Sequence, residues 1–151
     1  AMTFAYRLSD GQNTVVYATD NEPYEYSLHR LRGSEKKTTD YPQYLDQKFV
    51  EFIADADLCI GEAQYTMNEY RDKKGWGHSP IESTVEFAWR ARVKQLVLFH
   101  HDPLHDDTMV DKMVQQAQRI SRLRGGGLKC LGAREGMEIK VGRSSTAKSR
   151  R

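Results

Sequence analysis

The chain has 151 residues, 38% hydrophobic and 29% charged, a balance that indicates one globular domain and excludes a disordered chain. No stretch reaches the roughly 18 apolar residues of a membrane span and no signal region is present, so we expect a cytoplasmic protein without a membrane partner. Four of the 23 Lys and Arg lie in a basic, flexible tail at 143–151. The rest of the chain has 19 positive and 21 negative side chains, which argues against a folded body that binds nucleic acid through a basic surface.

A β-hairpin and a helix are predicted in the first part of the chain. The segments Thr3–Ser9 and Thr14–Thr19 have strand-like composition and are joined by the turn signal Asp10-Gly11. Residues 29–40 are polar and are expected to form a loop. Apolar residues then recur at helical spacing between positions 41 and 55, which predicts a helix.

Two buried strands flank a helix in the middle of the chain. Asp57–Gly61 and Gln95–Phe99 are short apolar runs of the kind that is buried on both faces of a sheet. Between them, Ser79 is predicted as a helix N-cap, with Pro80 in the first helical position and Glu82 completing a capping box.

The last third of the chain predicts a long helix and two closing strands. Asp107 can cap this helix, and Gly125–Gly127 end it. The strands are expected near Leu128–Gly132 and Met137–Val141. Because strands and helices alternate along the chain, the predicted fold class is α/β.

The two cysteines lie in apolar, strand-like runs. Neither Cys59 nor Cys130 has a cysteine or histidine nearby at metal-ligand spacing. Buried, reduced thiols are therefore expected in place of a disulfide or a zinc site.

Polar residues follow the predicted strands, where open α/β sheets usually bind ligands. Asp20, Glu62 and the pair His100-His101 each come after a strand, and His78 directly precedes the capped helix. A helix N-terminus disfavours a charged imidazole and attracts anions such as phosphate. Each residue also has an ordinary structural explanation, as a turn residue, a salt-bridge partner or a packing residue. Together these oxygen and imidazole groups suit zinc, manganese or iron, so they indicate a metal-dependent hydrolase without naming its substrate.

Five segments of the sequence carry a resemblance to a known family. They are Val15–Asp20, Gly61–Thr66, Gly75–Ser79, Leu96–Pro103 and Ala133–Glu138. In this order they resemble the second half of metallo-β-lactamase-superfamily phosphodiesterases, the branch of tRNase Z-like and cyclic-phosphodiesterase-like enzymes, over residues 3–142. The resemblance implies the C-terminal half of a four-layer αββα sandwich, with a mixed sheet and flanking helices.

The resemblance also implies a role for each site residue. Asp20 would bridge two divalent metal ions, zinc or manganese, and His100 would be a further metal ligand. His78 would donate a proton or a hydrogen bond to the leaving oxygen, and Glu62 would orient His78. The family often has histidine before this glutamate, where the present chain has Gly61. The implied reaction is hydrolysis of a small phosphodiester, a nucleotide or cyclic nucleotide, by a hydroxide that the metal ions activate.

One part of the family pattern is absent from the chain. The main metal-binding signature, His-x-His-x-Asp-His, belongs to the N-terminal half of the fold and occurs nowhere in this sequence. The chain alone is therefore expected to be inactive and to hold few or none of the metal ions.

Three explanations for this absence stay open. The chain is a fragment of a longer enzyme, which the Ala-Met start favours, or its partner subunit carries the other half. In the third, an identical copy covers the exposed sheet. The alternative function is a non-catalytic interaction or assembly domain that keeps the fold without a complete metal site. A further alternative is RNA binding through the basic tail, which would be strongly salt-dependent.

Overall fold

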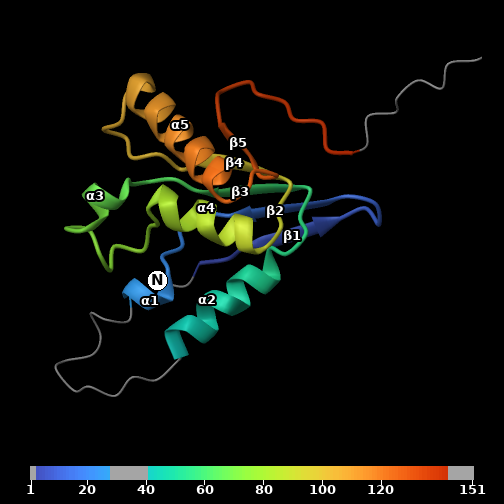
Figure 1. Cartoon of the computed structure of the whole chain (residues 1–151), viewed down its shortest axis with the longest axis horizontal. Helices are drawn as coiled ribbons and strands as arrows, with labels where there is room; N and C mark the ends of the chain where they lie inside the picture. The colour runs from blue at the N-terminus through green and yellow to red at the C-terminus, as the bar shows by residue number, and fades with distance from the viewer. Residues whose placement is uncertain (1–2, 28–40, 143–151) are drawn as a thin grey trace, which may run out of the picture.

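The computed structural model describes residues 3–27 and 41–142, so the predicted loop at 29–40 and the basic tail lie outside the described residues. Within this part of the chain, one mixed sheet has the strand order β1-β2-β3-β4-β5 (Figure 1). β1 pairs antiparallel with β2, and the other neighbours pair in parallel. The strands are β1 (Tyr6–Ser9), β2 (Thr14–Ala18), β3 (Leu58–Glu62), β4 (Gln95–Phe99) and β5 (Lys129–Gly132). The predicted α/β class with a mixed sheet is confirmed.

The longer helices connect the parallel strands and cover the sheet. They are α2 (Tyr41–Phe52), α4 (Ile81–Arg90) and α5 (Asp107–Leu123), and the single-turn helices α1 (Tyr24–Ser27) and α3 (Met67–Tyr70) precede two of them. In Figure 1, α4 and α5 lie across the sheet, and α2 packs against α4, where the rings of Phe49 and Phe87 are 5.7 Å apart. None of the described helices is long and apolar enough to cross a membrane.

One face of the sheet packs against the helices. The register row Ala18–Gly61–Leu98–Gly132 faces them, because a Cβ added at Gly61 would lie 2.9 Å from Thr84 of α4. A Cβ at Gly132 would similarly lie 2.9 Å from Val114 of α5. Glycine at these two positions therefore allows the helices to approach the strands closely.

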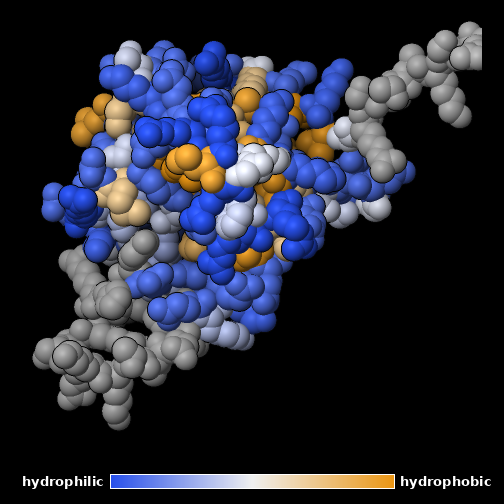
Figure 2. Space-filling view, viewed as in Figure 1, coloured by the Kyte–Doolittle hydropathy of each residue, from blue (hydrophilic) through white to orange (hydrophobic). Residues whose placement is uncertain are grey.

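The opposite side of the strands is partly exposed: Leu58, Glu62 and Val97 are buried there, and the exposed part is called the bare sheet face. Its exposed members are Tyr6, Leu8, Tyr17 and Phe99, which are 57%, 64%, 37% and 40% exposed. The rings of Tyr17 and Phe99 are 6.2 Å apart, so these aromatic side chains adjoin each other across β3. The helical side is largely hydrophilic in Figure 2, as a solvent-facing surface should be. The exposed members of the bare sheet face are instead aliphatic or aromatic.

The predicted capping box at the start of α4 is wrong. The helix begins at Ile81, and Pro80 is its N-cap without a side-chain hydrogen bond. The hydroxyl of Ser79 donates instead to the backbone oxygen of Asn21 at 2.7 Å, and the carboxylate of Glu82 accepts from the backbone N–H of Met67 at 3.0 Å. Both side chains thus bind distant segments, which ties the site loops to α4.

Two other predicted details differ from the structure. Asp106, and not Asp107, caps α5, since its carboxylate accepts a hydrogen bond from the backbone N–H of Met109 at 2.7 Å. The segment Met137–Val141 is irregular and pairs with no described strand. Its alternating apolar residues imitate a strand, but β5 ends the described part of the sheet.

Both cysteines are buried and free, which confirms the sequence prediction. Burial raises the pKa of Cys59 to about 12 and that of Cys130 to about 11. Because the thiolate is the reactive form, we expect neither cysteine to react with iodoacetamide at mildly alkaline pH until the chain is denatured. Intact-mass analysis checks this, with the exposed variant Ser9→Cys as a positive control. Labelling of the native chain as fast as that control would contradict the expectation.

Candidate metal centre

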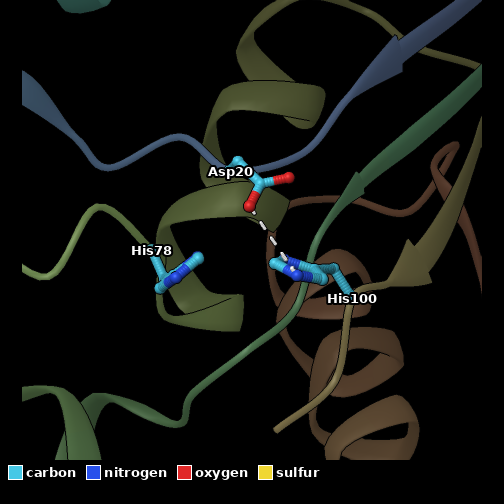
Figure 3. A group of neighbouring side chains, drawn as sticks. All are labelled: Asp20, His78 and His100. Atoms are coloured by element: carbon cyan, nitrogen blue, oxygen red, sulfur yellow. Dashed lines mark ion pairs between the residues drawn. The ribbon is translucent and has the colours of Figure 1, made fainter. Parts of the chain in front are cut away.

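Asp20, His78 and His100 meet at the edge of the sheet where the parallel strands end (Figure 3). Asp20 follows β2, His100 follows β4, and His78 lies in the loop before α4. One ligand atom from each residue lies within 4.8 Å of the other two. The convergence expected from the positions of these residues in the sequence is therefore present in the structure.

The backbone at two of these residues is strained. Asp20 and His100 have φ angles of 54° and 59°, in the left-handed region that non-glycine residues rarely adopt. Asp55 and Arg92 also have positive φ, but they lie before β3 and β4 and pair with each other through an exposed salt bridge of 2.7 Å. At the metal centre the strained residues instead present a carboxylate and an imidazole to each other, and such strain is frequent at functional sites.

Glu62 lies behind this group and is completely buried. Its carboxylate accepts a hydrogen bond of 2.5 Å from the backbone N–H of Asp20 and lies 3.0 and 3.2 Å from Nδ1 of His100. The other ring nitrogen of His100, Nε2, lies 3.7 Å from Oδ1 of Asp20. When Nδ1–H donates to Glu62, the lone pair on Nε2 points toward Asp20, which is the arrangement of a metal-ligating histidine.

His78 approaches the same carboxylate without a hydrogen bond. Its Nδ1 is buried and lies 3.5 Å from Oε1 of Glu62, and its ring is 5.1 Å from that of His100. Burial, together with the nearby His100, lowers the pKa of His78, and burial raises the pKa of Glu62 to about 7. His78 is therefore neutral at pH 7. Glu62 thus lies next to both histidines, but of the two only His100 forms a hydrogen bond with it.

Gly61 explains one departure from the family pattern. A Cβ at this position would lie 2.9 Å from Cγ2 of Thr84 and 3.1 Å from Leu96, on the helix side of the sheet. The side chain of Glu62 leaves the strand on the opposite side, toward the metal centre. A histidine at position 61 would collide with α4, so an additional ligand at this position does not fit.

The three converging residues fit a divalent transition metal. One carboxylate and two imidazoles are ligands that zinc and manganese accept. Bonds of about 2.0–2.1 Å in a tetrahedral zinc site place ligand atoms roughly 3.4 Å apart. The 3.7 Å between Asp20 and His100 is near that value, whereas His78 belongs to a looser group with atoms up to 4.8 Å apart. Asp20 and His100 are thus the better-placed pair of ligands.

The neighbouring His101 lies outside the group. Both its ring nitrogens are buried, and burial lowers its pKa. Beyond it, Nε2 of His105 lies 2.8 Å from Oε1 of Glu69, whose carboxylate also completes a capping box with Thr66 at the start of α3. The Thr-x-x-Glu spacing at 66–69 was a readable signal for this helix start that sequence reasoning did not use.

A cleft of about 690 Å³ opens beside Asp20 and His78. Trp76 lines it, and the loop that carries Trp76 is held by Glu22, which lies two residues after Asp20. Sequence reasoning missed Glu22 and Trp76. The sequence feature that could have indicated Trp76 is its position between Gly75 and Gly77. A tryptophan in such a glycine-rich loop has few neighbours that could bury it, which favours an exposed, ligand-binding role.

The chain is similar in sequence and in fold to known proteins. No protein-family model matches the sequence. The chain is 34% identical over 71 residues to ribonuclease Z of Anoxybacillus flavithermus and 41% identical over 69 residues to ribonuclease Z of Thermococcus sibiricus. These matches cover 47% and 46% of this chain but only 23% and 21% of the relatives, so the matching part spans about a fifth of their length.

The fold is similar to that of a solved structure. The metallo-β-lactamase fold protein YhfI from Bacillus subtilis superposes with a TM-score of 0.61 at 21% sequence identity. The superposition covers 88% of this chain and 41% of YhfI. The chain thus has part of the metallo-β-lactamase fold, as the sequence resemblance implied.

Proposed function

We propose, from the part of the metallo-β-lactamase fold that this chain carries, that it contributes one half of a metal-dependent site for phosphodiester hydrolysis. The observation that carries the proposal is the convergence of Asp20, His78 and His100 in front of the buried Glu62. The sequence likeness to ribonuclease Z supports a phosphodiester substrate. Within that class we propose a nucleotide or cyclic nucleotide.

The residues divide into ligands and supporting groups. Asp20 and His100 would hold a divalent zinc or manganese ion, with His100 binding through Nε2. Such an ion supplies Lewis acidity toward phosphate oxygens and activates water. His78, neutral at pH 7, donates a ring N–H hydrogen bond to the leaving oxygen. Glu62 fixes the tautomer of His100 and the turn at Asp20 by its hydrogen bonds to both.

The remaining ligands would come from a complementary polypeptide that covers the bare sheet face. Leu8 and Tyr6 on this face are more than half exposed, and the superposition spans less than half of YhfI. The complement would be the N-terminal half of the same parent chain, a separate subunit or a second copy. Covering the face removes apolar area from water, at about 25 cal/mol per Å².

A second candidate is a non-catalytic interaction or assembly domain. It is favoured by the donor count, since the candidate metal centre in the described part of the chain comprises three residues. Such a domain would use the bare sheet face for assembly and would have no need of the strained turns at Asp20 and His100. Metal binding therefore separates the two candidates.

Native mass spectrometry with and without zinc or manganese tests the proposed function. We expect the wild-type chain to take up metal weakly and Asp20→Ala to take up none. Hydrolysis of bis(4-nitrophenyl) phosphate by the chain alone should be slow or undetectable. A defined assembly with metal at fixed stoichiometry would identify a second copy as the complement. Equal metal uptake by wild type and Asp20→Ala would contradict the proposal. Efficient turnover by a monomer, abolished in Asp20→Ala, would show that the chain carries a complete site.

A further inference from the structure

The cleft beside the metal centre has aromatic walls. Its volume of about 690 Å³ lies within the range of small-molecule sites, roughly 300–1,000 Å³. Five aromatic side chains contribute to it, and the exposed ones are available to a ligand. They are Phe4, Tyr24, Phe49, Trp76 and Phe87, of which Trp76 is 61% exposed. Asp20 and His78 line the same cleft, so a ligand bound there would extend toward the metal centre.

Trp76 is held at the cleft by a carboxylate clamp. The side chain of Glu22 accepts hydrogen bonds from the backbone N–H groups of Gly75 at 2.6 Å and Gly77 at 3.0 Å, and from the hydroxyl of Tyr70. These bonds fix the chain on both sides of Trp76. An exposed indole in a loop fixed this way presents a rigid flat surface, because the entropy cost of ordering the loop is already met in the free protein.

Two polar side chains that line the cleft, Asp46 and Asn21, already form hydrogen bonds within the protein. The carboxylate of Asp46 accepts from the backbone N–H groups of Tyr24 and Glu25 at 2.7 and 3.0 Å. The side-chain amide of Asn21 donates to the backbone oxygen of Ala18 at 3.0 Å, and its oxygen accepts from the hydroxyl of Ser79 at 3.2 Å. We therefore expect a ligand in this cleft to be bound mainly through a flat apolar surface, and less through hydrogen bonds to these side chains.

We infer that the cleft binds the nucleobase of the substrate, with the Trp76 indole as its stacking surface. This inference rests on the proposed function, since it places the rest of a substrate whose phosphate would lie at the metal centre. His78 lies two residues after Trp76, so one fixed loop would contact both the base and the phosphate group. Because stacking tolerates any base, purine and pyrimidine nucleosides are expected to bind with similar affinity.

The test uses uncharged nucleosides and metal-free protein. Asp20, Glu22 and Asp46 line the cleft and disfavour a phosphate when no cation is bound, so adenosine is a better probe than a nucleotide. The variant Trp89→Phe leaves Trp76 as the only tryptophan of the chain. Adenosine, guanosine and cytidine should quench its fluorescence saturably in the presence of EDTA, whereas ribose should not. Circular dichroism verifies that the variant is folded.

Equilibrium dialysis of adenosine then tests the role of the indole itself. Trp76→Ala should bind adenosine about tenfold more weakly, and Trp76→Phe should retain most of the affinity because it keeps an aromatic ring. Leu123→Ala is a matched control, since Leu123 is 77% exposed at the end of α5 and does not line the cleft. Equal binding by wild type and Trp76→Ala, or no quenching by nucleosides, would overturn the inference. Because metal is absent throughout, failure of the proposed metal chemistry would leave this result unchanged.

Discussion

Zinc affinity is expected to fall at least about tenfold in Asp20→Ala and in His100→Ala, and to change little in His78→Ala. The structure gives the reason for this difference. Asp20 and His100 place their ligand atoms 3.7 Å apart, and Glu62 orients the His100 ring so that Nε2 is free to bind. The buried Nδ1 of His78 makes no hydrogen bond, so no contact comparable to that of His100 fixes its ring.

Competition of the chain with a fluorescent zinc chelator measures these affinities. Asp111→Ala is a suitable control, because this carboxylate is 60% exposed and pairs with Arg134 on the surface. Unchanged zinc affinity in both Asp20→Ala and His100→Ala would eliminate the metal centre as described. A loss in His78→Ala as large as in Asp20→Ala would make His78 a third ligand and would remove its assignment as hydrogen-bond donor to the leaving oxygen.

Replacing Glu62 by alanine is expected to lower the free energy of unfolding by about 2–4 kcal/mol. The side chain is fully buried, so its loss leaves a cavity, and it also leaves the backbone N–H of Asp20 without its acceptor. That N–H belongs to a residue with φ of 54°, so the hydrogen bond supports a strained turn. Urea unfolding of metal-free protein, followed by circular dichroism, measures the difference.

Two further variants separate the causes of this destabilisation. Glu62→Gln keeps the volume and one oxygen acceptor, so we expect it to cost about 1 kcal/mol. Glu51→Ala removes a carboxylate that is 50% exposed and paired with Lys48, and should cost less than about 0.5 kcal/mol. If Glu62→Ala were as stable as Glu51→Ala, the buried carboxylate would have no structural role.

The longer elements could be predicted from sequence because their signals are local. Each parallel strand is a short apolar run, and the apolar stripes of α2, α4 and α5 recur at helical spacing. The capping box at Ser79 failed for the opposite reason. The residue types were correct for a cap, but Asn21 and Met67, distant in sequence, provided better hydrogen-bond partners for Ser79 and Glu82. A pattern of four residues contains no information about such partners.

The candidate site was predictable to the level of which residues meet, but not how they pair. Asp20 and His100 follow parallel strands, and the carboxyl ends of such strands adjoin one edge of the sheet. Glu62 accepts a hydrogen bond from His100 and also approaches His78, and both contacts depend on a side-chain geometry that sequence spacing does not encode. The hydrogen bonds of Glu22 to the loop around Trp76 join residues more than 50 positions apart, so they could not be predicted from local sequence patterns either.

The strand order has a topological consequence for the bare sheet face. From β2 through β5 the chain always steps to the next position in the same direction. A right-handed crossover fixes the face over which each connection passes, so steps in one direction send every connecting helix over the same face. Sheets with helices on both faces reverse their winding at a switch point, and these parallel strands never do. The uncovered side therefore follows from the direction of winding itself, and a second layer must come from a separately wound segment.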